Sequence, residues 1–423
     1  MANNPVSITY IGHGQSGVWS DPRNWTNGVV PGAANTALFT SSAVLNGPIE
    51  VDNLMLLGAE TITINGQVKT DSANSCQSFM ACEGAEVTFT AGSQLLDAGG
   101  FITGIDAAAN VVADGAVGGI AAAVLNVADM KLGQMDGGSG TLTLAGGILN
   151  DGGIALVGLQ GAGILNVSGA GQANLGGLTI GAEAGGTGQL NLTGSAVVNI
   201  AGWTAVGTAI GGAPGGDGAA SVGTGSTLYC DHGFFVNDAS AIAMQGGTLL
   251  AGPDGIGLQI RQGGTVSGHG AITAAAKGVT DNGLLAAAGG TLVVTGNLSG
   301  MGAVQIGAGS TLHLITSKIT VPTLAFMGPA ATLELATGVV GNFTISGFAA
   351  SDQLVMNNID SASWSGATHV LTLSEHGQAL ERLTLSGVAA NAEFMVSAGT
   401  GGSIISLVSS TGHEMLNAAH FGH

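Results

Sequence analysis

The chain has few charged, aromatic, proline and cysteine residues for its length of 423. Charged residues make up 8% of the sequence, about a third of the share in an ordinary globular protein. Because lysine, arginine and glutamate are scarce and glycine is abundant, a long coiled coil is excluded. The absence of a strict three-residue glycine period excludes collagen. A hydrophobic content of 45% excludes disorder, which requires low hydrophobicity and high charge density.

Basic residues are especially rare. Seven lysines and arginines stand against 26 aspartates and glutamates, which gives a formal net charge of −19. Such a charge repels phosphate backbones and anionic membrane surfaces, so we expect no nucleic-acid partner. No apolar run reaches the roughly 18 residues of a membrane-spanning helix, so we expect no membrane insertion.

Three cysteines cannot all pair within one chain. Cys76 and Cys82 lie close enough in the sequence to close a small loop, and Cys230 is predicted to be a small buried hydrophobic residue. Whether Cys76 and Cys82 form a disulfide depends on the compartment and stays open at this point.

Glycine is what the chain has in excess, with 76 residues, and many of these glycines mark an internal repeat. Glycine-led strands recur at spacings of 23, 25 and 30 residues: Gly140-Thr-Leu-Thr-Leu144, Gly163-Ile-Leu-Asn-Val167, Gly188-Gln-Leu-Asn-Leu192 and, more weakly, Gly218-Ala-Ala-Ser-Val222. Between them lie short apolar strands that end in glycine: Val157-Gly158, Ile180-Gly181 and Val206-Gly207. Apolar residues alternate along each strand, as in a strand with one buried face.

One such unit cannot bury its inward residues alone, but units stacked in parallel bury them in a continuous interior. Glycine permits the positive φ that narrow corners need. We therefore predict an all-β fold, a right-handed parallel β-solenoid (β-helix) of short glycine-punctuated coils with small residues inside. A β-propeller or β-sandwich would need strands of about 5–6 residues and periodic aromatics, which the sequence lacks.

Further along the chain the strands recur in a different pattern: Val266-Ser-Gly-His-Gly-Ala-Ile272, Gly290-Thr-Leu-Val-Val-Thr295, Leu298-Ser-Gly-Met-Gly-Ala-Val304 and Ile306-Gly-Ala-Gly-Ser-Thr-Leu312. This string resembles the passenger β-solenoid repeats of bacterial autotransporters and related large secreted adhesins. Trp19-Ser-Asp-Pro-Arg-Asn-Trp25, followed by Gly28 and Pro31, is similar to the opening found ahead of such solenoids. The resemblance implies a secreted or surface-associated protein of a Gram-negative bacterium.

The last strands, from Ile345-Ser-Gly-Phe348 to Gly402-Ser-Ile404, resemble the C-terminal solenoid modules of such proteins. No translocator β-barrel follows before His423. The first residues also lack the basic and apolar segments of a signal peptide, so we expect export through a dedicated channel without a cleaved N-terminal signal.

Four segments are expected from these patterns. Residues 1–55 are predicted to form an N-terminal cap and first coils, and residues 56–340 the β-solenoid body, irregular from Cys76 to Asn110. Residues 341–408 are predicted to form a C-terminal solenoid module, and residues 409–423, with His413, His420 and His423, a solvated tail.

Candidate chemistry is sparse. Gly268-His269-Gly270 matches part of the catalytic region of β-solenoid pectin hydrolases, but those enzymes also need clustered carboxylates, and the sequence has no Asp-Asp pair. Gly12-His13-Gly14 occurs as well, so we place His269 at a turn. Gly215-Gly216-Asp217-Gly218 is a single, uniterated calcium-like string, and isolated calcium ions stay open. We therefore assign no catalytic, cofactor-binding or metal residue and expect no cofactor.

Asparagines recur near successive strands at Asn166, Asn174, Asn191 and Asn199, which predicts internal amide ladders. Taken with the resemblance, these features favour a non-enzymatic structural or adhesive subunit of a surface or matrix fibre, self-associating head-to-tail. One alternative is a carbohydrate-active β-helix lyase or hydrolase, which would need a groove with two nearby carboxylates or a carboxylate with Arg or Lys. Another is a glycan-binding fibre in which Trp203, Trp364 or Phe234-Phe235 stacks on sugar rings.

Overall fold

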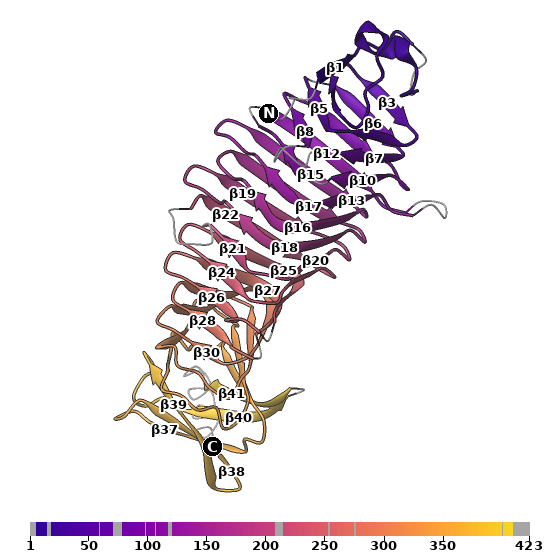
Figure 1. Cartoon of the computed structure of the whole chain (residues 1–423). Coiled ribbons are helices and arrows are strands. Elements are labelled where there is room, and N and C mark those ends of the chain that lie inside the picture. The colour runs from indigo at the N-terminus through magenta and orange to yellow at the C-terminus, as the bar shows by residue number, and fades with distance from the viewer. Residues whose placement is uncertain are drawn as a thin grey trace, which may run out of the picture. The chain divides into compact units, whose positions relative to one another are not determined.

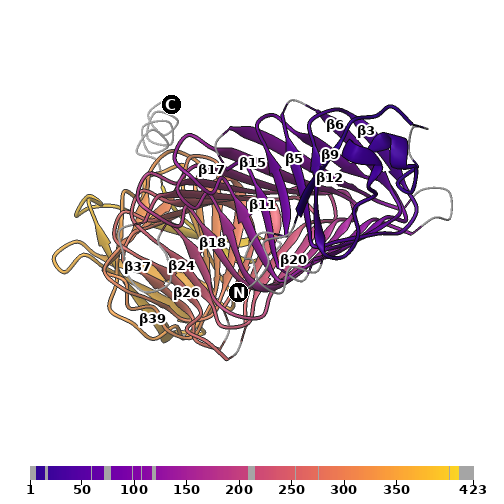
Figure 2. The same ribbon diagram turned by 45° about the horizontal axis from the view of Figure 1, so that its top comes forward.

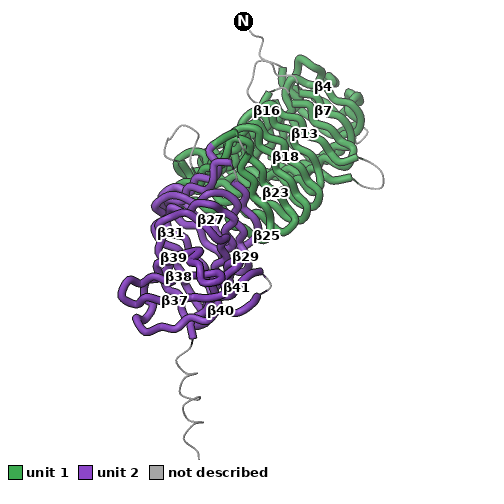
Figure 3. The backbone as a smooth tube through the Cα atoms, turned by 90° about the horizontal axis from the view of Figure 1, so that it is seen from below, with its two compact units in different colours: residues 1–255 green, residues 256–423 purple. Residues whose placement is uncertain are grey.

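The computed structural model describes residues 6–14, 18–58, 60–70, 78–97, 99–105, 107–116, 121–207, 215–252, 254–274, 276–399 and 401–408. Over these residues the protein is all-β, and its two helical segments are the short 3-10 turns η1 (Pro22–Asn24) and η2 (Thr26–Gly28). No helix among the residues just given is long and apolar enough to span a membrane. The chain forms two compact units, residues 1–255 and 256–423 (Figure 3).

The strands of unit 1 are β1 (Val6–Tyr10), β2 (Asn35–Phe39), β3 (Ala43–Asn46), β4 (Ile49–Val51), β5 (Asn53–Leu57), β6 (Thr61–Asn65), β7 (Gln67–Thr70), β8 (Phe79–Cys82), β9 (Glu86–Phe89), β10 (Gln94–Asp97), β11 (Gly100–Thr103), β12 (Ala108–Asp114), β13 (Val124–Val127), β14 (Asp129–Leu132), β15 (Ser139–Ala145), β16 (Ile148–Val157), β17 (Ala162–Ser168), β18 (Gln172–Ile180), β19 (Thr187–Leu192), β20 (Val197–Ile200), β21 (Thr204–Val206), β22 (Asp217–Gly223), β23 (Thr227–Cys230), β24 (Phe234–Val236) and β25 (Ala241–Ala251).

The strands of unit 2 are β26 (Leu258–Ile260), β27 (Thr265–Thr273), β28 (Val279–Asp281), β29 (Leu284–Thr295), β30 (Leu298–Ser299), β31 (Ala303–Ile306), β32 (Thr311–Ile315), β33 (Thr323–Phe326), β34 (Thr332–Leu335), β35 (Thr344–Ser346), β36 (Gln353–Met356), β37 (Ser361–Ser365), β38 (Val370–Glu375), β39 (Gln378–Ser386), β40 (Phe394–Gly399) and β41 (Gly402–Leu407).

Parallel pairing runs through unit 1, with each strand bonded to a strand one repeat further along the chain (Figures 1 and 2). The register confirms the phase of the repeat, because β15, β17, β19 and β22 align Gly140, Gly163, Gly188 and Gly218 with one another. This long, mostly parallel arrangement is compatible with a β-solenoid.

Glycine is required at the aligned positions because neighbouring backbone atoms leave no room for a side chain. A Cβ atom on Gly163 or Gly188 would overlap the backbone nitrogen of Gly158 or Gly181, respectively. Gly158 and Gly181 directly follow the last residues of β16 and β18 and have φ of +73° and +70°. The predicted glycine corners are therefore confirmed at these positions.

The interior of unit 1 is built from larger side chains than expected. Leu142, Leu165 and Leu190 stack in register and are fully buried. Phe79 and Phe101 are also fully buried and stack with ring centroids 5.0 Å apart. The prediction of an interior of small residues is wrong here, because alternating leucines and phenylalanines point inward.

The described residues between Phe79 and Asn110 form regular strands, which corrects the expected irregularity from Cys76 to Asn110. Five strands, β8 to β12, lie within or across it: β8, β9 and β10 pair in parallel with β5, β6 and β7, and β11 and β12 pair in parallel with β8 and β9. They were hard to recognise in the sequence because β8 to β11 are only four residues long, and β8 and β11 are buried along their whole length and so lack alternation. Cys76 itself lies outside the described residues, so the Cys76–Cys82 pairing stays open.

Unit 2 begins with parallel strands and changes direction near its end. β36 pairs antiparallel with β41, β37, β38 and β39 form an antiparallel meander, and β40 pairs antiparallel with β41. This differs from the parallel coils expected for residues 341–408. One of these reversals, between β38 and β39, is made by a two-residue turn at His376 and Gly377, whose φ values of +49° and +79° suit a tight hairpin. The expected tail, with His413, His420 and His423, lies outside the described residues.

Candidate functional site

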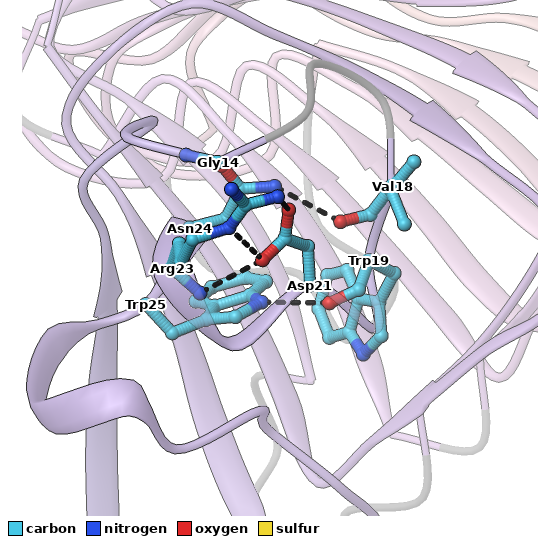
Figure 4. Close-up of polar contacts among 7 residues, drawn as sticks. All are labelled: Gly14, Val18, Trp19, Asp21, Arg23, Asn24 and Trp25. Carbon is cyan, nitrogen blue, oxygen red and sulfur yellow. Dashed lines mark hydrogen bonds and ion pairs between the residues drawn. The ribbon is translucent and has the colours of Figure 1, made fainter.

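The string from Trp19 to Trp25 forms a compact cover beside β1. The Asn24 side chain bridges two loop segments: its Oδ1 accepts the Gly14 amide at 2.7 Å and its Nδ2 donates to the Val18 carbonyl at 3.0 Å (Figure 4). Asp21 caps η1 by accepting the Arg23 amide and also pairs with the Arg23 guanidinium at 2.7 Å. Asp21 and Asn24, the buried polar residues between Trp19 and Trp25, therefore both have structural partners.

Aromatic rings fill the space beneath this cover. Trp25 is 1% exposed, donates through Nε1 to the Trp19 carbonyl at 2.8 Å, and packs edge-on against Tyr10 and Phe39. The Ile11 amide donates to the Asn24 carbonyl at 2.7 Å, so the cover also satisfies part of the edge of β1. These residues stabilise the start of unit 1 and present no reactive group.

Three buried aspartates are the most unusual ionisable groups. Asp97, Asp151 and Asp281 are 5%, 3% and 0% exposed, and in each the Oδ2 atom has no hydrogen-bond partner among the described residues. Burial disfavours the charged form and raises the pKa of each carboxyl to about 6. Backbone amides of Gly99, Gly153 and Gly283 donate to the Oδ1 atoms. Each aspartate therefore closes a glycine turn.

An amide ladder runs along the outer side of β13, β16, β18 and β20. Asn150 donates to Asn126, Asn174 to Asn150, and Asn199 to Asn174, each through Nδ2 to Oδ1 at 2.8 to 3.0 Å. The ladder ends at Asn199, which is exposed and whose Oδ1 has no donor in the described part of the chain. The register places Tyr229 next in the same column.

A second ladder lies on β15, β17, β19 and β22. Asn166 donates to Thr143 at 3.3 Å, Asn191 donates to Asn166 at 2.9 Å, and Ser221 donates to Asn191 at 3.1 Å. Both ladders confirm the predicted stacking of asparagines. Their position was wrong, because the side chains are half-buried or exposed on the outer face and the inward positions carry apolar residues.

A shallow groove of about 370 Å³ lies beside the first ladder. Its lining includes Asn174, Asn199, Tyr229, Asp151 and Asp231. The hollow exists because residues 152 and 176, which follow the ladder column at the corner, are glycines without side chains. The volume is within the range of small-ligand sites, about 300–1,000 Å³.

Tyr229 and Asp231 act as a pair at one end of the groove. The Tyr229 hydroxyl donates to Asp231 Oδ1, and this hydrogen bond raises the pKa of Tyr229. The ring is half-buried on the outer face, and Asp254 adds further negative charge nearby. No described residue that lines the groove is basic.

The two carboxylates of this groove are far apart. Asp151 aligns with Leu175, Leu175 with Ile200, and Ile200 with Cys230, so Asp231 lies three strands away. Three parallel strands span about 14 Å. Glycosidase carboxylates lie about 5 to 9.5 Å apart. The groove therefore lacks the spacing of that mechanism.

Asp129 is a closer carboxylate that the sequence did not reveal. It lies 22 positions before Asp151, and its negative charge adds to the rise in the pKa of Asp151. Parallel pairing of consecutive repeats brings the two together, which linear spacing could not show. Asp151 is almost fully buried, so this pair does not present an acid and a base to a solvent-borne substrate.

A second groove, of about 290 Å³, brings Lys69 and Asp97 to the same lining. Asp97 is 5% exposed and accepts hydrogen bonds from Thr70 and Ser78, and Lys69 pairs with Glu50 at 2.7 Å. Both charges therefore have structural partners.

His269 lies within β27, where the register with β29 shifts between Gly268 and Gly270. Both glycines have positive φ, so His269 marks a bend in the strand. Asp217 is exposed in β22. In the described ranges, no three His, Cys, Asp or Glu side chains come together in a way that could hold a metal ion.

The aromatic residues considered for sugar stacking have different surroundings. Phe234 is fully buried, which excludes it from that role. Trp203 is half-buried and packs against His232 and Phe235 at 5.5 and 5.7 Å. Trp364 is half-buried in unit 2 and donates to the Ala389 carbonyl at 3.0 Å. Tyr229, beside the ladder and the groove, was not singled out by the sequence.

Cys230 is fully buried, as predicted, and its thiol donates to the carbonyls of Gly202 and Gly233 at 3.1 Å. Burial raises the pKa of this thiol, which disfavours the nucleophilic thiolate form.

No protein-family model and no curated protein matches the chain. The resemblance to autotransporter passengers therefore stays a prediction.

Proposed function

We propose that the chain is a non-enzymatic structural and adhesive protein that acts outside the cell or on its surface. The observation that supports it most directly is where the ionisable and the amide side chains lie. The carboxylates with a strongly raised pKa are buried behind glycine turns, whereas the outer faces repeat amide side chains from strand to strand.

The finer fold proposal is a right-handed parallel β-solenoid of short coils. The parallel register of β15, β17, β19 and β22 supports it, as do the glycine corners at Gly158 and Gly181. A long surface that repeats the same side chains from strand to strand suits a protein that binds many copies of a partner at once.

Self-association stays part of this proposal, but its form needs refinement. Asn24 and Thr26 accept hydrogen bonds from the amides of Ile11 and Thr9 in and beside β1. Head-to-tail stacking on this edge would therefore have to displace residues 24–26. Lateral contact between outer faces requires no such displacement.

Two measurements test the proposal together: the location of the chain on cells and the attachment of those cells to a surface. An antibody against the folded chain is expected to label intact cells of the source organism, and cells without the gene are expected to attach less to a surface. Labelling only after permeabilisation, with unchanged attachment, would contradict the proposed function. A strain that carries the gene on a plasmid is the control for the deletion.

A further inference from the structure

We propose that the groove between Asp151 and Tyr229 binds an uncharged hexose chain. This inference rests on the proposed function, because it names the ligand class by which an adhesive surface would attach. The groove crosses the middle of β16 and β18 and the ends of β20 and β23, a distance of about 14 Å. That length fits an oligosaccharide better than a single sugar.

The side chains of the groove can bind both the apolar ring face and the hydroxyl groups of a sugar. A pyranose ring has an apolar face that packs on an aromatic ring, and Tyr229 offers a half-buried ring on the outer surface. Its hydroxyl is fixed by Asp231, which holds the ring in place. Sugar hydroxyls also need donors and acceptors on fixed supports.

Fixed polar groups line the rest of the groove. The ladder holds Asn174 and Asn199 in one orientation through hydrogen bonds of 2.8 and 3.0 Å, and it leaves Asn199 Oδ1 as an acceptor. Asp151 is 3% exposed, lines the groove and has an Oδ2 atom without a partner among the described residues. That atom is itself buried, so ligand hydroxyls bind to the amides of Asn174 and Asn199, and Asp151 adds only negative charge beneath the groove.

Charge selects the ligand class. Asp231 and Asp151 line the groove, Asp254 acts on Tyr229 from nearby, and the whole chain carries a formal charge of −19. With no basic residue among the described lining residues, a uronic acid or sulfated chain would be repelled. Uncharged hexoses carry no such penalty.

The test is calorimetric titration of the full chain with cellohexaose, maltohexaose and mannohexaose, with an oligogalacturonate as the acidic comparison. We expect at least one neutral hexasaccharide to bind and the acidic chain not to bind. Tyr229→Ala should weaken binding about tenfold or more, and Tyr229→Phe should keep most of it. Asn199→Ala should weaken it, whereas Asn191→Ala, in the other ladder, should not.

Gly152→Gln provides a second route if Tyr229→Ala does not fold. Nothing lies within 4 Å of a Cβ at Gly152, so a side chain there fills the groove without disturbing the core. This variant should lose binding while keeping its circular dichroism spectrum. The groove proposal fails if no neutral hexasaccharide binds, if the acidic chain is preferred, or if folded Tyr229 and Gly152 variants bind as the parent does. Surface labelling together with any of these results would leave the proposed function standing.

Discussion

Among single residues, the buried aspartates have the most strongly raised pKa values. Asp97, Asp151 and Asp281 each use one oxygen to accept a glycine amide and leave the other without a partner in the described chain. A buried carboxylate with one unsatisfied oxygen favours the protonated form. Their glycine partners at the next-but-one position were visible in the sequence, but burial was not.

These aspartates predict a fold that is more stable in mild acid. The pKa of each is about 6 when folded, against about 3.9 in an unfolded chain. Between about pH 4 and 6 the folded state binds more protons than the unfolded state. The contribution of each protonated aspartate to the free energy of unfolding is therefore complete below about pH 4 and is lost as the pH rises through about 6. The free energy of unfolding measured in urea should decrease by up to about 3 kcal/mol per carboxyl from about pH 4 to neutral pH.

Asp151→Asn isolates the contribution of one carboxyl. It should flatten the dependence of unfolding free energy on pH and leave the variant at least as stable as the parent above neutral pH. Asp217→Asn is the matched control, because Asp217 is exposed and its replacement removes the same formal charge. Equal flattening in both variants would show that net charge, and not burial, causes the effect.

Among the elements, the glycine column determines how closely neighbouring strands approach. The sequence predicted this column from the spacing of Gly140, Gly163, Gly188 and Gly218, and the register confirms it. Alternation of leucines also predicted which side faces inward. The β38–β39 hairpin in the antiparallel end of unit 2 was missed because its His376-Gly377 turn lies among many other glycines.

Gly163→Ala is predicted to destabilise unit 1. Its Cβ would overlap backbone atoms of Gly158, and overpacking of this kind costs about 1–3 kcal/mol. Gly152→Ala, in the neighbouring β16, is the matched control because nothing lies within 4 Å of its Cβ. Thermal unfolding should give a lower Tm for Gly163→Ala only. A similar Tm for both variants would show that the strands can separate without cost.

The candidate groove combines features that the sequence could and could not reveal. Asn174 and Asn199 were predicted to stack, because they recur at the repeat spacing. The position of Tyr229 in the same column could not be foreseen, since the spacing to β23 is longer and interrupted by glycines. The nearness of Asp129 to Asp151 likewise depends on strand register.

For the whole molecule, the central question is whether this surface binds without cutting. A β-helix lyase or hydrolase needs an accessible acid and base, whereas Asp151 is buried and Asp231 lies about 14 Å along the stack. The outer ladders repeat the same chemistry over several strands, which suits attachment to a repetitive polymer.

The most direct test is to incubate the full chain with neutral and acidic polysaccharides and to measure polymer length by size-exclusion chromatography. The account predicts that every polymer keeps its length. Release of short oligosaccharides that is abolished by Asp151→Asn or Asp129→Asn, but not by Asp217→Asn, would contradict it and identify the chain as a carbohydrate-active enzyme.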